Sequence, residues 1–499
     1  MICVSIARGR HRYMMAEHRH LVEQGAELVE LRLDYIRRAV NVKRLLNNRP
    51  SPIIATCRRE RDHGKWTKSE RERLMLLRAA IADGADYVDL EEDIADQIPR
   101  YGQTKRIISY HNFEETPDDL LGLANRLASL DADIVKIATM AHDPHDNIRM
   151  LDMVKRAPVP TVGICMGELG TPTRLLTGRY GAPFSYATFH SERTLAPGQL
   201  SFHEMKEVYD YDRIGPQTSL YGVIADPIGH SYSPRIHNAA FRAAGIDAAY
   251  LPFRVPRHFL SSFFDDVPAL GVRGLSVTIP HKESVLRLLT KVDKAADKIG
   301  AVNTVVFQDD GQIVGYNTDQ KAAMASLLAT PGLKGREAPL EGQQALVLGA
   351  GGVARAIVYG LVRHGAQVTI ASRTLARAED LAEQFNAKAV TWAERYGRRW
   401  DIVINGTPIG MHPNVEETPY EKQYLRRGMI VFDTVYNPEN TLLIKEARAK
   451  ECRVVTGIDM FVRQAALQFK LFTGQDAPRD VMRDEMRQAT SPARRRSVG

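Results

Sequence analysis

The chain has 499 residues, which is more than one hydrophobic core usually holds, so two or more domains are expected. Its 44% apolar and 25% charged residues are ordinary for a globular protein, and no apolar run approaches the length that spans a membrane. The net charge of +7 suits small anionic ligands, and no motif for binding nucleic acid accompanies it.

The cysteines and the chain ends favour a reducing compartment. Cys3, Cys57, Cys165 and Cys452 show no CxxC or metal-type spacing, and three of them lie in apolar, strand-like runs. The amino terminus enters a strand pattern directly, without the features of a signal peptide. We therefore expect a cytoplasmic protein without a metal site, with a basic, disordered tail over residues 488–499.

Eight short, β-branched apolar runs recur through the first half, separated mostly by helix-compatible stretches. They begin near Ile2, Glu27, Pro52, Tyr87, Arg106, Asp133, Pro160 and Phe184. A spacing of roughly 25 residues predicts a (β/α)8 barrel, or TIM barrel, over residues 1–215.

Charged residues stand toward the carboxyl ends of the predicted barrel strands. They are Glu30 and Arg32, Arg58, Asp89 and Glu91, His111, and Lys136. Strands buried on both faces should be apolar, and a barrel carries its chemistry at this end, so these residues indicate a site.

Lys136 lies in Asp133-Ile134-Val135-Lys136-Ile137-Ala138, with apolar residues on both sides. Burial favours a neutral amine, which is the form that attacks a ketone to give an imine. His111 could move the proton that such chemistry requires. Structural roles, a lysine paired with a carboxylate and a packed histidine, are the alternatives for each residue alone.

Several segments together resemble type I 3-dehydroquinate dehydratases in order and approximate spacing. They are Glu30 to Asp34, Ser109-Tyr110-His111, the Lys136 strand, Met166-Gly167, Thr173-Arg174-Leu175 and Ala196-Pro197-Gly198-Gln199. The resemblance implies a Schiff base between Lys136 and the substrate ketone, proton transfer by His111, and release of 3-dehydroshikimate.

The same resemblance implies the contacts with 3-dehydroquinate. Arg174 would bind the carboxylate, because its planar fork suits two-pronged recognition. Glu30, Arg32, Arg58 and Gln199 would hold hydroxyls and line the pocket. Two positions depart from the family: Asp62 replaces a glutamate that supports the histidine, and Leu195 replaces a serine.

The pattern changes near residues 212–216, where we expect a domain boundary. A strand over Leu220–Ile224 opens a smaller α/β domain over 216–322. A second α/β domain over 323–456 contains the strand 345–348, the turn Gly349-Ala350-Gly351-Gly352-Val353-Ala354, a helix and the strand 368–370. This βαβ unit predicts a Rossmann-like fold, and we expect a helix over 457–487 to return to the smaller domain.

A glycine-rich turn of this kind lets the backbone approach a pyrophosphate at a helix amino terminus, although such turns also occur without nucleotides. An NAD-binding fold places an acidic residue about 20 residues after the turn. This chain instead has Ser372-Arg373-Thr374, with Arg377 one turn later. The two arginines can pair with a 2′-phosphate, so the sequence predicts NADP as the cofactor.

Three motifs precede the glycine turn. Ser231-Tyr232-Ser233-Pro234 reads as a helix start with Ser233 as the N-cap and Pro234 at the first helical position, which leaves Ser231 unexplained. The others are Ser276 to Lys282 and Asn317-Thr318-Asp319. Asp319 alone could simply cap the helix that follows it.

From Leu220 to about Gly474 these motifs resemble shikimate dehydrogenase, together with Ala301 to Thr304, Asn405-Gly406-Thr407, Asp433 to Tyr436, and Gly457 to Gln464. The resemblance implies that Lys282 and Asp319 form the acid–base pair. The implied substrate contacts are Ser231, Ser233, Thr278, Asn303, Tyr436 and Gln464. The implied cofactor contacts are the turn residues 349–354 together with Ser372, Arg373, Thr374, Arg377, Thr407, Val435 and Gly457. Ser276 and Gln320 depart from the commoner asparagine and glycine.

The two resemblances imply consecutive steps of the shikimate pathway, from 3-dehydroquinate to 3-dehydroshikimate to shikimate. All partners implied are small molecules, with no nucleic acid, no membrane and an undetermined oligomeric state. A quinate dehydrogenase in the second half is one alternative. A non-catalytic sensor is another, but such a relative should lack at least one of Lys136, His111, Lys282 and Asp319.

Overall fold

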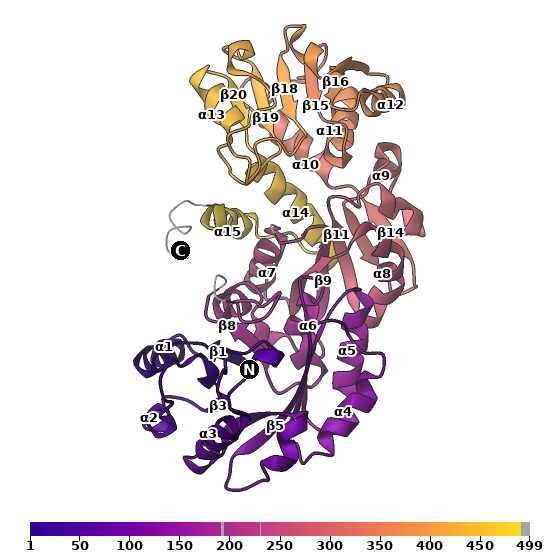
Figure 1. The fold of residues 1–499 in the computed structure, drawn as a ribbon. Coiled ribbons are helices and arrows are strands. Elements are labelled where there is room, and N and C mark those ends of the chain that lie inside the picture. Colours follow the sequence, from indigo (N-terminus) through magenta and orange to yellow (C-terminus); the bar gives the residue numbers. More distant parts are fainter. Residues whose placement is uncertain (191–193, 230, 491–499) are drawn as a thin grey trace. The chain divides into compact units, whose positions relative to one another are not determined.

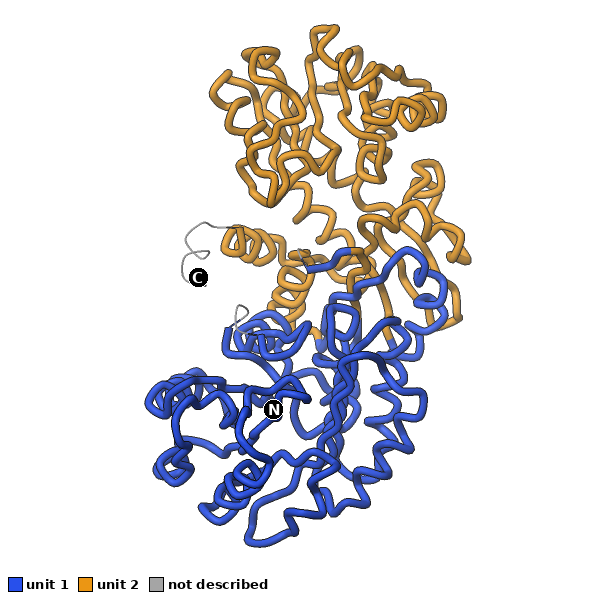
Figure 2. Tube along the Cα trace, viewed as in Figure 1, with its two compact units in different colours: residues 1–220, 227–229, 247–271 blue, residues 221–226, 230–246, 272–499 orange. Residues whose placement is uncertain are grey.

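The structure is a computed structural model that describes residues 1–190, 194–229 and 231–490 (Figure 1). The chain forms two compact units (Figure 2). The first comprises residues 1–220, 227–229 and 247–271, and the second comprises 221–226, 230–246 and 272–499.

The predicted (β/α)8 barrel is confirmed: eight parallel strands form one sheet in the order β7-β6-β5-β4-β3-β2-β1-β8. The strands are β1 (Ile2–Ile6), β2 (Leu28–Arg32), β3 (Ile53–Thr56), β4 (Tyr87–Glu91), β5 (Lys105–Asn112), β6 (Ile134–Met140), β7 (Thr161–Met166) and β8 (Ser185–Thr188). Each begins within two residues of its predicted start. Each strand is hydrogen-bonded to the next in this order, but within residues 161–188 no ladder joins the two end strands, β7 and β8. The barrel is therefore nearly closed.

Helices alternate with these strands, as the parallel topology requires. They are α1 (His11–Glu23), α2 (Val42–Leu46), α3 (Glu70–Ala82), α4 (Leu120–Ala128), α5 (His145–Arg156) and α6 (Thr171–Leu176). The start of α3 shows the local logic, because Ser69 and Glu72 form a capping box that satisfies two free backbone N–H groups. Apolar residues of the strands and helices form the core between them.

Two further six-stranded sheets follow. The order of one is β10-β9-β11-β13-β14-β12, and that of the other, all parallel, is β17-β16-β15-β18-β19-β20. The first contains β9 (Ser219–Ala225), β10 (Ala248–Arg254), β11 (Val272–Val277), β12 (Lys291–Val292), β13 (Thr304–Phe307) and β14 (Ile313–Tyr316). The second contains β15 (Gln344–Leu348), β16 (Gln367–Ser372), β17 (Lys388–Thr391), β18 (Ile402–Asn405), β19 (Ile430–Asp433) and β20 (Arg453–Val455). The Rossmann-like prediction is confirmed.

The helices of this part are α7 (Ser233–Ala243), α8 (Leu260–Asp266), α9 (Lys294–Ile299), α10 (Asp319–Leu328), α11 (Gly352–Arg363), α12 (Leu375–Phe385), α13 (Leu442–Ala449), α14 (Gly457–Thr473) and α15 (Arg479–Thr490). The single helix predicted over 457–487 was wrong, since α14 and α15 are separate. Gly474 ends α14 with a φ of 75°, a left-handed conformation that suits glycine, and Pro478 lies in the connection. The helix α14 contacts α7, β11 and β13.

The predicted tail lies mostly outside the described residues, which end at residue 490. Its first three residues, 488–490, belong to α15 instead. In the described part of the chain, none of the helices combines the length and the apolar character needed to cross a bilayer.

Candidate active sites

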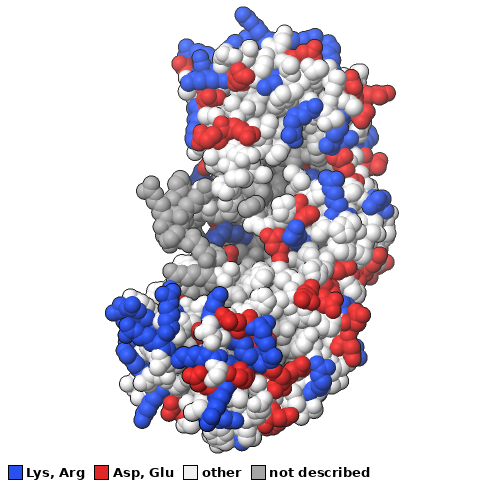
Figure 3. Space-filling view, in the orientation of Figure 1, with Lys and Arg blue, Asp and Glu red and all other residues white. Residues whose placement is uncertain are grey.

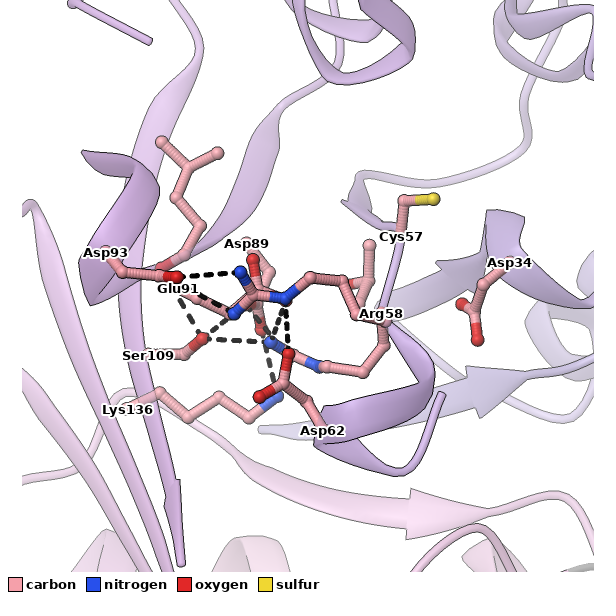
Figure 4. Close-up of polar contacts among 12 residues, drawn as sticks. Asp34, Cys57, Arg58, Asp62, Asp89, Glu91, Asp93, Ser109 and Lys136 are labelled. Carbon is pink, nitrogen blue, oxygen red and sulfur yellow. Dashed lines mark hydrogen bonds and ion pairs between the residues drawn. The ribbon is translucent and has the colours of Figure 1, made fainter. Parts of the chain in front are cut away.

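Lys136 in β6 is 7% exposed and lies among carboxylates (Figure 4). Its Nζ is 3.0 Å from Asp89 Oδ2 and 3.6 Å from Glu30 Oε1, and 4.1 Å from the centroid of the Tyr186 ring. The carboxylate pairing considered from the sequence is therefore present. It fixes the amine at one point of the barrel interior, which is also what a nucleophile needs.

Arg58 follows β3 and joins the carboxylates of β4 (Figure 4). Its Nη2 donates to Asp89 Oδ1 at 3.0 Å, and its Nη1 donates to Glu91 Oε1 at 2.8 Å and to Ser109 Oγ at 3.2 Å. Burial opposes the charge of Asp89, but Arg58 and Lys136 outweigh it and hold the pKa of that carboxyl well below its usual range.

A second layer of charges supports this network. Arg73 of α3 is fully buried and donates to Glu91 Oε2 at 2.9 Å and to the Cys57 carbonyl at 2.7 Å. Glu70, on the same helix, accepts from Arg73 at 2.6 Å. Because every buried charge has an oppositely charged partner here, the position of Arg58 is fixed from both sides.

Glu30 and Arg32, at the end of β2, have different partners. Glu30 accepts hydrogen bonds from Ser5 at 2.6 Å and Thr56 at 2.9 Å. Burial raises the pKa of Glu30, but Lys136 and Arg32 overcome this and lower it overall. Arg32 forms a two-pronged pair with Asp34 at 2.9 and 2.8 Å.

His111 shares a face of the sheet with Lys136. Ser109 pairs with Lys136 across β5 and β6, and His111 is two residues further along β5, so its side chain points to the same side. Burial, together with the charges of Arg58 and Lys136, holds the pKa of His111 well below 6.5. The histidine is therefore neutral at neutral pH and can accept a proton. Asp62 pairs with Arg59 at 2.5 Å, and among the described residues no contact joins it to His111.

Arg174 in α6 is a buried cation without an acidic partner among the described residues. It is 2% exposed, its Nη2 donates to the Pro197 carbonyl at 3.1 Å, and its Nε has no acceptor. Burial lowers the pKa of Arg174 to about 10. Such a guanidinium is suited to an anion from outside the chain. Gln199 Oε1 accepts from the Leu195 backbone N–H at 2.9 Å, which leaves its amide nitrogen available.

Lys282 and Asp319 meet in the second unit. Lys282 Nζ lies 2.5 Å from Asp319 Oδ2, and Asp319 is 3% exposed. Asp319 is the first residue of α10 and makes no capping hydrogen bond, so the capping role considered for it was wrong. Asn317 Oδ1 instead accepts from the Gln320 backbone N–H at 3.2 Å.

Asn303 connects this pair to α14. Its Nδ2 donates to Asp319 Oδ1 at 3.0 Å and lies 3.5 Å from Gln464 Oε1. Gln468, one turn after Gln464, donates to the Asn303 carbonyl at 3.0 Å and accepts from Ser276 Oγ at 2.8 Å. Ser276, which departs from the family's commoner asparagine, thus belongs to a buried chain of hydrogen bonds that ends at Asp319.

The serines before α7 differ from the prediction by one position. The helix begins at Ser233 with Tyr232 as its N-cap, and the Ser233 backbone N–H donates to Ser231 Oγ at 3.3 Å. Ser231 therefore supplies the local hydrogen bond that the sequence assigned to Ser233, because the helix starts one residue earlier than the proline suggests.

Two further predicted substrate residues, Tyr436 and Thr278, have different surroundings. The ring centroid of Tyr436 is 6.2 Å from that of Tyr232 and 4.3 Å from that of Phe461. Thr278 follows β11 and is half-buried, and within the described ranges its side chain makes no hydrogen bond to the other predicted substrate residues.

The glycine turn connects β15 to α11 and leaves its backbone open. Gly349 has a φ of 105°, and a Cβ there would lie 3.0 Å from the Gly406 carbonyl oxygen. A Cβ at Gly351 would meet no atom within 4 Å, so space remains beside the helix start. Ala350, Val353 and Ala354 complete the turn and the first residues of the helix. These features fit a pyrophosphate-containing cofactor.

Lys282 lies against this turn. A Cβ at Gly352 would come within 3.0 Å of Lys282 Cβ and Cδ. The predicted acid–base pair and the predicted cofactor turn are therefore adjacent in space, although Lys282 and Gly352 are 70 residues apart in the sequence. Thr407 is held by Asn405 Oδ1 at 2.7 Å, and Val435 by Asp433 Oδ1 at 3.0 Å. Gly457 packs on the Val435 carbonyl so closely that a Cβ would lie 2.3 Å from its oxygen.

The predicted phosphate-binding arginines follow β16. Ser372 ends the strand and Thr374 is the N-cap of α12. Arg373 is exposed, and no side-chain contact is recorded for it among the described residues. Arg377 Nη2 lies 3.2 Å from Glu283 Oε1 and 3.3 Å from the Ala350 carbonyl oxygen.

Four contributors to these sites were not assigned roles from the sequence: Asp89, Arg73, Gln468 and Glu283. Asp89 was among the charged residues noted at the carboxyl ends of the predicted barrel strands. Gln468 could have been found from its i, i+4 spacing to Gln464, which places both on one helix face. Arg73 and Glu283 carry no such signal, because the site residues that they contact, Glu91 and Arg377, are distant in sequence. In residues 1–190, 194–229 and 231–490, no three His, Cys, Asp or Glu side chains are grouped to hold a metal ion.

Comparison with protein families gives four matches along the chain. Type I 3-dehydroquinase matches residues 2–216, and the shikimate dehydrogenase substrate binding domain matches 223–305. Shikimate / quinate 5-dehydrogenase matches 333–441, and the shikimate 5'-dehydrogenase C-terminal domain matches 457–487.

Individual proteins agree with these matches. A bifunctional 3-dehydroquinate dehydratase/shikimate dehydrogenase, chloroplastic, of Arabidopsis thaliana is 38% identical over 96% of this chain and 83% of its own length. A shikimate dehydrogenase (NADP(+)) of Methanosarcina acetivorans is 41% identical over 54% of this chain and 98% of its own. A crystal structure of a shikimate dehydrogenase in complex with NADP+ is 36% identical, covers 56% of this chain and 98% of its own, and has a TM-score of 0.51.

Proposed function

Because the chain belongs to the family of bifunctional 3-dehydroquinate dehydratases/shikimate dehydrogenases, we propose that Lys136 and His111 carry the dehydration and Lys282 and Asp319 the reduction. The protein is thus a lyase and an NADP-dependent oxidoreductase. It converts 3-dehydroquinate to 3-dehydroshikimate, and then 3-dehydroshikimate to shikimate. The observation that carries the assignment is the pairing of each lysine with a buried carboxylate at a site suited to an anionic substrate.

In the dehydratase site, the Lys136 amine adds to the substrate ketone and water leaves, which forms an imine. The imine acidifies the neighbouring carbon, and neutral His111 removes a proton from it. The hydroxyl at the next carbon takes this proton from His111 and leaves as water, and hydrolysis of the imine releases the product and restores the lysine. Asp89 and Glu30 stabilise the positive charge of the protonated imine.

Substrate binding in this site follows from the charges on the chain. Arg174 binds the substrate carboxylate, since it is a buried cation with no acidic partner among the described residues. Arg58, Glu30 and Gln199 bind hydroxyls. Arg32 helps to shape the pocket through its pair with Asp34, and the leucine at 195 removes one hydroxyl that relatives offer.

In the dehydrogenase site, the bound NADPH supplies a hydride to the substrate ketone. Lys282 donates a proton to the ketone oxygen, and Asp319 holds the lysine in place and stabilises its charge. Asn303 and Gln464 lie beside this pair and hydrogen-bond the substrate, together with Ser231, Ser233, Thr278 and Tyr436.

The turn over 349–354 would hold the cofactor, with its backbone N–H groups available to a pyrophosphate at the start of α11. Arg373 and Arg377 would bind the 2′-phosphate, with Ser372 and Thr374 beside them. Thr407, Val435 and Gly457 would complete the cofactor site.

We further propose three domains: the dehydratase over 1–215, a substrate-binding domain over 216–322 completed by α14 and α15, and an NADP-binding domain over 323–456. The four cysteines are free thiols, as a reducing compartment such as the cytoplasm favours. The Arabidopsis relative is named chloroplastic.

Incubation with 3-dehydroquinate and NADPH tests the proposal directly. Shikimate should appear with equimolar loss of NADPH. Borohydride added with 3-dehydroquinate should reduce the imine to a stable amine, and peptide mapping by mass should place the adduct on Lys136. An adduct on another lysine, or none, would contradict the Schiff-base assignment.

A further inference from the structure

A cavity of about 350 Å³ lies at the amino-terminal edge of the Rossmann-like sheet, away from both proposed sites. It is lined by residues that come just before the strands or begin them: Gln343 before β15, Asp401 before β18, Met429 before β19 and Arg453 at the start of β20. The glycine turn follows the carboxyl end of β15. A five-residue strand spans about 16 Å, so the cavity and the cofactor turn are at opposite edges of one sheet.

Four arginines line this cavity: Arg336, Arg426, Arg427 and Arg453. Among the described residues that line it, Asp401 is the only one with a carboxylate, and it accepts a hydrogen bond from the Gln344 backbone N–H at 2.9 Å. Arg427 pairs with Glu451 at 3.0 Å. Over the part of the second unit where Figure 1 places β18 and β20, Figure 3 shows Lys and Arg side chains with some Asp and Glu among them.

The other three arginines have no carboxylate partner among the described residues. Arg453 donates to the carbonyl of Gly428 at 2.8 Å and to that of Pro331 at 2.8 Å, and Arg426 donates to the carbonyl of Trp400 at 3.2 Å. Among the described residues, none forms a hydrogen bond or an ion pair with the Arg336 side chain. Carbonyl contacts orient a guanidinium but leave its charge uncompensated, so the cavity presents several positive charges to one small volume.

We propose that this cavity binds a small phosphorylated anion with at least two negative charges. Arginine forks match the oxygens of a phosphate group in two-pronged geometry, and binding would neutralise the mutual repulsion of Arg336, Arg426 and Arg453. The volume is that of a small-molecule site. This site is separate from the 2′-phosphate contacts of Arg373 and Arg377.

Isothermal titration calorimetry of the full chain with pyrophosphate tests this inference. Saturating NADP+ and shikimate keep the proposed dehydrogenase site occupied. A binding event that Arg336→Gln weakens about tenfold is expected, because a charge-assisted contact is lost. Arg336 makes no recorded side-chain contact, so its substitution should leave folding and both activities unchanged.

Arg287→Gln is the matched control, since it removes an exposed arginine elsewhere in the same unit. Arg426→Gln provides a second variant of the cavity and should weaken pyrophosphate binding similarly. Equal weakening by Arg287→Gln, or unchanged binding in both cavity variants, would overturn the site. Citrate that binds as tightly as pyrophosphate would overturn the phosphate assignment. Because both activities are measured in parallel, failure here is distinguishable from failure of the proposed function.

Discussion

Glu283 Oε1 lies 3.2 Å from Arg377 Nη2, and Glu283 directly follows Lys282 in the chain. One segment therefore carries the proposed proton donor and, on the next residue, the carboxylate that pairs with a proposed phosphate-binding arginine. Arg355 Nε is a second neighbour of Glu283, at 3.9 Å. A 2′-phosphate on Arg377 would compete with Glu283 for the same guanidinium.

Glu283→Gln should therefore lower the KM for NADPH and change that for NADH less. Both side chains are about half exposed, so the released pairing is worth at most about 1 kcal/mol, or up to about fivefold in affinity. Steady-state kinetics of shikimate formation measures both constants. Glu379→Gln removes an exposed carboxylate from α12 without a recorded contact to Arg377 and serves as the control. An increased KM for NADPH would show that Glu283 assists cofactor binding instead.

The dehydrogenase should prefer NADPH to NADH, and Arg373→Gln should reduce that preference. A lost charge-assisted contact to phosphate is worth roughly 1.5–3 kcal/mol, which corresponds to about one to two decades in kcat/KM for NADPH. The value for NADH should hardly change. Equal kcat/KM for the two cofactors in the unsubstituted protein would refute the assignment of Arg373 and Arg377.

The two reactions should be separable by single substitutions. Lys136→Ala should abolish dehydration, because it removes the amine proposed to form the imine, and should leave reduction of supplied 3-dehydroshikimate nearly intact. Lys282→Ala or Asp319→Ala should instead cause 3-dehydroshikimate to accumulate from 3-dehydroquinate. Product analysis by chromatography distinguishes these outcomes. Loss of both activities from either substitution would contradict independent sites.

The pH profile of the dehydratase should place the acidic limb of kcat/KM below pH 6.5. Burial, with the nearby charges of Arg58 and Lys136, lowers the pKa of His111 below that value, so the neutral form that accepts a proton persists into mildly acidic solution. Activity falls only once the pH drops below the lowered pKa. His111→Asn should lose the dehydratase activity and keep the dehydrogenase activity. A limb at or above pH 6.5 that this substitution removes would contradict a depressed pKa.

Gln468→Met should lower kcat of the dehydrogenase more than it raises KM for 3-dehydroshikimate. The glutamine does not contact Asp319 but fixes Asn303, which does, so its loss should misplace the acid–base pair by a fraction of an ångström. About a tenfold loss is expected, measured by NADPH oxidation. Gln468→Glu keeps the acceptor for Ser276 but loses the donor to Asn303, and should resemble the methionine variant. Full activity in both variants would assign Gln468 to packing alone.

The sequence by itself predicted the architecture and both lysines. Periodic apolar runs mark strands because a strand buried on both faces must be apolar, and a charged residue inside such a run is costly unless it has a function. Lys136 stands out for this reason, whereas Arg174 and Lys282 were assigned through the resemblance to known families. The glycine turn and Arg373 were also readable, since they depend on residues close together in the chain.

Only the tertiary structure decided which side chains meet. Asp89 reaches Lys136 across 47 positions, and Asp319 reaches Lys282 across 37. Whether Asp319 caps a helix or pairs with a lysine depends on where α10 lies relative to the segment before it, and no local pattern encodes that. The first residue of α7 and the end of α14 at Gly474 were predicted wrongly. A serine, a proline or a glycine permits several turn geometries, and the packing around it selects one.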